Sequence, residues 1–204
     1  MAIKYFVTAI HTDSGKTIAS AILCEALKAD YWKPVQAGSP YDSQVIRQLV
    51  QNATTRIHPE AYALKLPASP HAAAKNEGIN IHLDSFHLPQ SENLIVEGAG
   101  GALVPLNDSD LIIDLASKFS LPVILVSNYY LGSINHTLLT VEALQHRRVE
   151  ITGIIFNGER NEQSREIILK RTGLKCLLDI DKEVQIDRAM IERYARKLNE
   201  TGIR

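Results

Sequence analysis

Short runs of β-branched and apolar residues alternate along the chain with longer segments whose apolar residues recur at helical spacing. The short runs are continuously apolar, which is typical of strands covered on both faces of a parallel sheet. The predicted strands are Ile3–Ala9, Tyr31–Val35, Leu94–Glu97, Pro122–Ser127, Ile151–Asn157 and Lys175–Ile180. The predicted helices are Thr17–Ala29, Leu111–Phe119, Ile134–Gln145, Glu162–Arg171 and Arg188–Leu198.

The alternation of strands and helices predicts an α/β protein with three layers, in which helices cover both faces of a mainly parallel sheet. A length of 204 residues without an evident linker predicts that residues 1–204 form a single domain. The segment 51–89 is rich in Ala, His and Pro, and we expect it to form loops and short helices rather than core strands.

Charge and composition exclude several classes of partner. The 22 Lys and Arg residues nearly balance the 23 Asp and Glu residues, so no strong basic field favours nucleic acid or an anionic membrane. No apolar run approaches the roughly 20 residues of a membrane span, and the N-terminal segment does not resemble a targeting signal. Cys24 and Cys176 each lie next to aliphatic residues, which predicts buried reduced thiols and a cytoplasmic protein.

A phosphate-binding loop is predicted where the first strand leads into Thr12-Asp13-Ser14-Gly15-Lys16-Thr17. A strand, a turn and then Gly-Lys-Thr at the start of a helix is the context that a P-loop requires. Backbone N–H groups of such a loop bind phosphate, the Lys16 ammonium reaches the β- and γ-phosphates, and the Thr17 hydroxyl ligates Mg²⁺. The match is partial, because Ile10 stands where the consensus has its first glycine.

Two more strand ends carry charged residues. Lys33 lies near the end of the second predicted strand, with Asp42 a few residues later, and Glu97 ends the strand Leu94–Glu97 before a run of glycines. A carboxylate at the tip of a buried strand is the usual arrangement for a metal next to a P-loop. Because ligands of open α/β sheets bind at the carboxyl ends of the strands, these residues predict a nucleotide site at that edge.

In this order, the segments resemble those of the dethiobiotin synthetases, ATP-dependent ligases of the P-loop NTPase superclass. The resemblance covers about three quarters of the chain and rests on six parts, which are Thr12–Thr17, Lys33–Gly38 followed by Asp42, Ser69–Ala73, Val96–Gly101, Leu131–Thr140 and Asn157. It implies that 7,8-diaminononanoate is carboxylated by CO₂, that ATP phosphorylates the carbamate, and that the second amine closes the ring to give dethiobiotin, ADP and phosphate.

The resemblance also implies roles for individual residues. Catalysis would depend on Thr12, Lys16 and Lys33, and the metal ligands would be Thr17, Asp42 and Glu97. ATP would be bound by Asp13, Ser14, Gly15, Lys16, Thr17, Glu97, Gly98, Ala99, Gly100 and Asn157, with Mg²⁺ as cofactor. The diamine would be bound by Thr12, Lys33, Ala37, Gly132, Ser133, Ile134 and Asn135. Because the family takes the last four of these from the partner subunit, a homodimer with the site at its interface is implied.

The chain departs from the family at several positions. Ala9 stands in place of a glycine, Ala37 replaces a serine, and Asp179–Lys182 occupies the region of a proline-containing adenine loop, so nucleobase contacts are open. His11 replaces an aspartate, and two interpretations remain: a solvent-facing loop histidine or a contact to substrate or phosphate.

Two other functions stay open at this point. A partition or positioning ATPase of the same superclass is a binding switch, but its signature lysine is replaced here by His11. An amidoligase acting on a corrin acid would need a source of ammonia, usually a glutaminase domain, for which this chain has no room.

Overall fold

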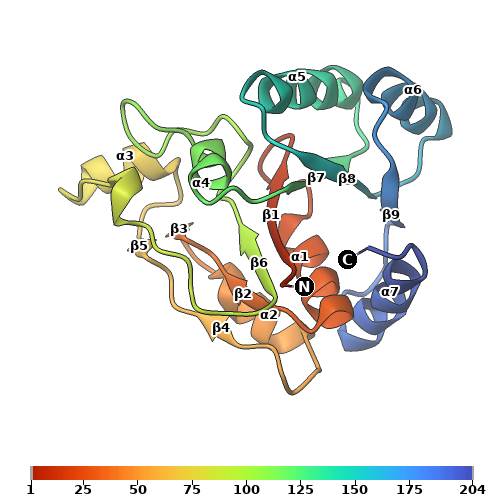
Figure 1. Ribbon diagram of the computed structural model, residues 1–204, viewed down its shortest axis with the longest axis horizontal. Coiled ribbons are helices and arrows are strands. Elements are labelled where there is room, and N and C mark those ends of the chain that lie inside the picture. The colour runs from red at the N-terminus through yellow and green to blue at the C-terminus, as the bar shows by residue number, and fades with distance from the viewer. Residues whose placement is uncertain (1, 204) are drawn as a thin grey trace.

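The computed structural model describes residues 2–203, and its centre is a seven-stranded, entirely parallel sheet (Figure 1). The strand order is β4-β2-β6-β1-β7-β8-β9. These strands are β1 (Lys4–Ala9), β2 (Asp30–Trp32), β4 (Ile57–His58), β6 (Leu94–Glu97), β7 (Val123–Asn128), β8 (Ile151–Asn157) and β9 (Cys176–Ile180). The predicted α/β architecture with a parallel sheet is confirmed.

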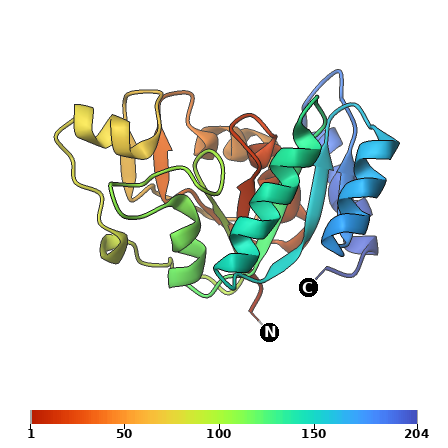
Figure 2. The same ribbon diagram turned by 90° about the horizontal axis from the view of Figure 1, so that it is seen from above.

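Helices cover both faces of this sheet (Figures 1 and 2). One face carries α1 (Lys16–Leu27), α2 (Asp42–Leu49) and α7 (Arg188–Glu200), and the other carries α4 (Ile112–Lys118), α5 (Ser133–His146) and α6 (Glu162–Thr172). A short helix α3 (Pro70–Asn76), a single 3₁₀ turn (Leu83–Ser85) and a two-stranded sheet of β3 (Val35–Ala37) and β5 (Tyr62–Leu64) extend the molecule beside α4.

The continuously apolar strands follow from this double cover. In β1, Tyr5 and Val7 pack toward α1 while Phe6 between them packs toward α4, because successive side chains of a strand point to opposite faces. All three side chains are buried. A strand in this position therefore cannot alternate apolar and polar residues without placing a polar group in one of the two cores.

The prediction of one strand over Tyr31–Val35 is wrong. The chain leaves the main sheet after Trp32 and enters the small sheet at Val35, so that Lys33 and Pro34 lie between two strands. Proline has no N–H for a sheet ladder, which is why the pairing of β2 with β6 stops before it.

The segment 51–89 contains more strand than predicted. Ile57–His58 forms the edge strand β4 of the main sheet, paired with Tyr31 and Trp32, and Tyr62–Leu64 forms β5. Both strands have only two or three residues, too few for an apolar period to be visible in the sequence. Helix α2 was not predicted either; it is a single amphipathic element of eight residues that buries Ile46 and Leu49.

The burial of the two cysteines and the length and polarity of the helices bear on two further predictions. The prediction of a buried thiol is confirmed for Cys24 in α1 and is wrong for Cys176, which is half-buried at the start of β9; both thiols are free. Within residues 2–203, every helix is too short or too polar to cross a bilayer.

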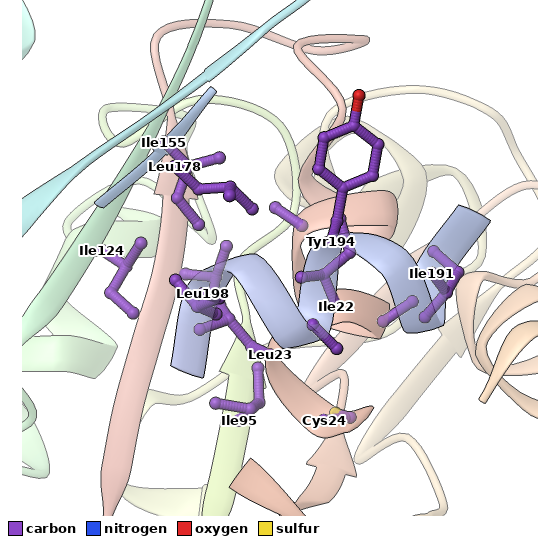
Figure 3. Packing of buried hydrophobic residues seen from close by; sticks show 14 of the residues in the cluster. Ile22, Leu23, Cys24, Ile95, Ile124, Ile155, Leu178, Ile191, Tyr194 and Leu198 are labelled. Atoms are coloured by element: carbon purple, nitrogen blue, oxygen red, sulfur yellow. The ribbon is translucent and has the colours of Figure 1, made fainter. Parts of the chain in front are cut away.

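Helix α7 packs against α1 and closes the core on that face (Figure 3). Ile191, Tyr194 and Leu198 of α7 lie against Ile22 and Leu23 of α1, and all of them are buried. Apolar contacts of this kind connect the last helix to the first one, so we expect the chain to unfold as one unit.

Replacing Leu198 tests this expectation. Leu198→Ala removes a fully buried side chain and should lower the free energy of unfolding by about 2–5 kcal/mol. Trp32, the only tryptophan, lies in the core of the opposite face, so its fluorescence reports on a distant part of the sheet. Denaturant midpoints from Trp32 fluorescence and from far-UV circular dichroism should fall together.

The control for this experiment is Val184→Ala, at a side chain that is 105% exposed, which should change stability by less than about 0.5 kcal/mol. A fluorescence midpoint that stays at its original value while the dichroism midpoint falls would mean that α7 unfolds separately.

Candidate active site

The loop between β1 and α1 has the conformation of a phosphate-binding turn. Asp13 and Gly15 have φ angles of 60° and 93°, and a Cβ atom added at Gly15 would lie 2.3 Å from Nδ2 of Asn157. Glycine is therefore required at position 15 on two grounds, its backbone angle and its close neighbour. Ala9 belongs to β1 and Ile10 follows it, both outside the left-handed region, so neither position requires glycine.

Hydrogen bonds hold this loop in shape. The Ser14 hydroxyl donates to the His11 carbonyl at 3.0 Å, and the Lys16 ammonium donates to the same oxygen at 3.4 Å. The Asn157 side-chain amide donates to the Ser14 carbonyl at 3.0 Å and so connects the end of β8 to the loop. The backbone N–H groups at the start of α1 are thereby held ready for an anion.

A cluster of charged residues lies beside the loop. The Lys33 ammonium donates to Glu97 Oε1 at 3.0 Å and also to Asp42 Oδ2. The Thr17 hydroxyl lies 3.0 Å from Asp42 Oδ1 and 3.1 Å from Glu97 Oε1. Lys33 is 4% exposed and Glu97 is fully buried, so each charge depends on the other for its compensation.

Burial and neighbouring charges shift the two lysines in opposite directions. Burial lowers the pKa of Lys16 to about 8, against the opposing effect of the Glu97 charge. Burial also acts to lower the pKa of Lys33, but the adjacent Glu97 and Asp42 outweigh it, and the pKa lies above its ordinary value. Lys33 is thus held as a cation, whereas Lys16 has a desolvated ammonium that gains most from an added anion.

The three oxygen-bearing residues Thr17, Asp42 and Glu97 fit a magnesium ion. The Thr17 hydroxyl lies within hydrogen-bond distance of both carboxylates, and Mg²⁺ prefers such hard oxygen ligands. Residues 2–203 contain no cluster of three or more His, Cys, Asp or Glu side chains that could hold a metal by themselves. A metal here would therefore complete its coordination with phosphate oxygens and water.

An open cavity of about 660 Å³ lies over the loop and the charged cluster. It contains most of the residues singled out from the sequence, namely Thr12, Asp13, Gly15, Lys16, Thr17, Lys33, Ala37, Asp42, Glu97, Ala99 and Gly100. Ser14, Gly98, Asn157 and the segment Gly132–Asn135 are not part of its lining. Ser14 and Gly98 are buried.

Comparison with known proteins identifies the family. Residues 4–190 match the profile of a family described as an AAA domain. ATP-dependent dethiobiotin synthetase BioD of Cytophaga hutchinsonii is 58% identical over 198 residues, and these cover 96% of each chain. The enzyme of the same name from Christiangramia forsetii is 47% identical, with 95% of each chain covered. The chain belongs to the ATP-dependent dethiobiotin synthetase family.

Solved structures with similar folds are more distant in sequence. A ParA family ATPase from Chlorobium tepidum superposes with a TM-score of 0.62 at 11% identity, covering 98% of this chain and 99% of the other. The septum site-determining protein MinD from Pyrococcus horikoshii superposes with a TM-score of 0.61 at 13% identity, covering 99% of this chain and 98% of the other. This likeness concerns the fold alone and confirms the P-loop NTPase architecture; it does not favour the partition or positioning ATPase over the dethiobiotin synthetase.

The segment Gly132–Asn135 of this family member lies at the start of α5, next to a second cavity. Gly132 has a φ angle of 106° and precedes the first helical residue, Ser133, which is buried, while Asn135 is exposed. The second cavity, of about 350 Å³, lies between α5 and the loop that follows Glu97. Thr12 lines both cavities, so they are neighbours, but the segment does not reach Lys33 within one chain.

His11 lines this second cavity and is half-buried. Its ring packs edge-on against Tyr130, with the two centroids 5.0 Å apart, and its Nε2 atom is buried without a hydrogen-bond partner among the described residues. The Tyr130 hydroxyl in turn is hydrogen-bonded to Nδ1 of His136 on α5. His11 is thus half-buried, with one ring edge against Tyr130 and another part lining the cavity, and its role stays a prediction.

The region of the expected adenine loop is occupied by a network of polar side chains. Arg165 donates to both oxygens of Asp179, at 3.0 and 3.2 Å. The Tyr194 hydroxyl accepts from the Asp181 backbone N–H at 3.0 Å and donates to Glu183 at 2.7 Å. These contacts fix the chain after β9 without a proline.

Sequence reasoning missed two residues of the site. The hydroxyl of Tyr31, a fully buried residue, donates to Oε2 of Glu97 at 3.0 Å, and burial followed by the Glu97 charge raises its pKa well above the ordinary value. The Gln36 side-chain oxygen accepts from the Asp42 backbone N–H at 3.2 Å and so fixes the start of α2. Tyr31 carries no chemical signal in the sequence, because tyrosine is common in strands for packing alone. A single glutamine such as Gln36 carries no such signal either.

Proposed function

We propose that this protein converts 7,8-diaminononanoate, CO₂ and ATP to dethiobiotin, ADP and phosphate, as an ATP-dependent cyclo-ligase. The observation that carries the proposal is the pair of buried lysines, Lys16 of the loop and Lys33 of the charged cluster, which line one cavity. The names of relatives at 58% and 47% identity support this reaction over that of other P-loop proteins.

The first requirement of this reaction is electrostatic. Carboxylation of one amine produces a carbamate anion, and this anion must attack the γ-phosphate of a nucleotide that is itself a polyanion. Lys16 and Lys33 would offset this repulsion, and they lie where the nucleotide phosphates and the carbamate would meet. Because both ammonium groups are desolvated, each acts more strongly on a developing charge than it would in water.

The proposed metal ligands are Thr17, Asp42 and Glu97. These residues would hold a magnesium ion, which would supply charge neutralisation on the nucleotide phosphates. The Lys33 ammonium already pairs with the carboxylates of Asp42 and Glu97. Two of the proposed metal ligands therefore hold the same ammonium group that would face the carbamate.

The second step closes the ring. The free amine attacks the carbonyl carbon of the carbamic–phosphoric anhydride and loses a proton, while the C–O bond to phosphate breaks and inorganic phosphate leaves with the bonding electrons. The exposed Thr12 hydroxyl lies at the junction of the two cavities, and we assign to it the orientation of the carbamate. Ala37 has no hydroxyl, so its contact to the diamine is through the backbone.

The carboxylate of the diamine would bind at the start of α5 of a partner subunit. A helix N-terminus binds anions through its free N–H groups, and the chain there is exposed, with Leu131 at 104% exposure and the apolar Leu139 half-exposed on α5. Exposed leucines beside a cavity favour a homodimer interface at this position. A cytoplasmic location, ATP as the nucleotide, and Asn157 as a contact to the base complete the proposal.

An omission assay tests the proposed reaction. ADP release should require ATP, Mg²⁺, bicarbonate and 7,8-diaminononanoate together, and leaving out any one should reduce it to background. Mass spectrometry should detect dethiobiotin in the complete mixture. ADP release that ignores the diamine, or that DNA or lipid vesicles stimulate, would instead indicate an ATPase switch.

Replacing Lys33 tests the charged cluster. Lys33→Ala should lower kcat by roughly 10²–10³, because the phosphoryl group in transfer loses one stabilising cation. Lys170→Ala, at an exposed lysine on α6, is the control and should leave kcat within twofold. Circular dichroism and binding of a non-hydrolysable ATP analogue verify that the variant folds. A folded Lys33→Ala variant with kcat within twofold of the parent would remove Lys33 from the reaction.

Complementation between two inactive variants tests the shared site. Lys16→Ala removes the loop cation, and Asn135→Asp places a negative charge where the diamine carboxylate is proposed to bind. If each site takes its loop from one subunit and its α5 start from the other, co-expression should restore about a quarter of the parental activity, through one intact site per heterodimer. An activity equal to that of the two variants measured separately would place both residues in one chain's site.

A further inference from the structure

Tyr31 is part of the charged cluster although it lies within the hydrophobic core. It pairs with Ile95 in the register of β2 and β6, and Glu97 is two residues further along β6 on the same face. Two residues of a strand span about 6.6 Å, which a tyrosine ring can reach across. Its hydroxyl accordingly meets Glu97 Oε2 at 3.0 Å.

The two oxygens of Glu97 have separate partners. Oε1 accepts from Thr17 at 3.1 Å and from Lys33 at 3.0 Å, and thus faces the loop and the cavity. Oε2 accepts from Tyr31 and faces the core. Since the carboxylate is fully buried, it has no water with which to replace a lost donor.

We propose that Tyr31 is a positioning residue that fixes the orientation of the Glu97 carboxylate and thereby strengthens binding of the nucleotide-bound divalent cation. The inference rests on the metal site of the proposed function. Without the tyrosine hydroxyl, Oε2 is a buried acceptor without a donor, and the carboxylate rotates toward Lys33 and Thr17 to replace it. Partners of metal ligands commonly change metal affinity by about 10–100-fold when they are removed.

The variant Tyr31→Phe tests this role because it removes one oxygen and keeps the ring that fills the core. Mn²⁺ serves as the probe, since the electron paramagnetic resonance signal of the free ion disappears on binding. In the presence of ADP, the Kd of Mn²⁺ should rise by about tenfold or more relative to the parent. The Kd of ADP measured without metal should stay within twofold.

Tyr5→Phe is the matched control. Tyr5 is a buried tyrosine in the same core, on β1, and its hydroxyl has no hydrogen bond to the charged cluster among the described residues. Its Kd for Mn²⁺ should equal that of the parent. Thermal unfolding of both variants shows whether each is folded at the temperature of the measurement.

A double-mutant comparison separates positioning from packing. Glu97→Gln should weaken Mn²⁺ binding by itself, and adding Tyr31→Phe to it should have little further effect, because the carboxylate that Tyr31 positions is gone. Additive losses, or a Tyr31→Phe variant whose Kd for Mn²⁺ is within twofold of the parent, would mean that Tyr31 only fills the core. None of these binding measurements uses the diamine. A failure of the proposed ligase reaction would therefore leave the result on Mn²⁺ binding unaffected.

Discussion

A buried lysine held between two carboxylates is the constraint on which the rest of the site depends. Lys33 and Glu97 are almost wholly buried, and an isolated charge in either position would cost several kcal/mol. The ion pair with Glu97, completed by Asp42, offsets that cost only when three segments are in place together. These are the chain between β2 and β3, the end of β6, and the start of α2.

The parallel sheet supplies the geometry that this cluster needs. β6 lies between β1 and β2, so the carboxyl ends of three strands meet at one edge, and the loop after β1 begins α1 directly beside them. Thr17 on α1 then contacts both carboxylates, and Asn157 at the end of β8 braces the loop from the other side. The hydrogen bonds of the loop and those of the charged cluster are joined through consecutive residues of α1, Lys16 and Thr17, so the loop is held beside the proposed metal ligands.

The fold and the site carry different information about function. Partition and septum-site ATPases have the same architecture at 11–13% identity, and the sheet by itself does not separate a binding switch from a ligase. The residues around the loop do separate them. His11 is packed against Tyr130 at the position of the switch's signature lysine, and Lys33 adds a second buried cation beside the loop.

Local sequence patterns determined most strands of the main sheet, most of its helices, and the loop from Thr12 to Thr17, because each of these depends on neighbouring residues in the chain. The break of the second strand at Pro34 and the two-residue edge strand β4 depend on pairing with distant segments, and the sequence did not predict them. Tyr31 shows the same limit at the site. Its contact with Glu97 exists only because β2 and β6, some 60 residues apart in the sequence, are neighbours in the sheet, and only the tertiary structure decides which strands are neighbours.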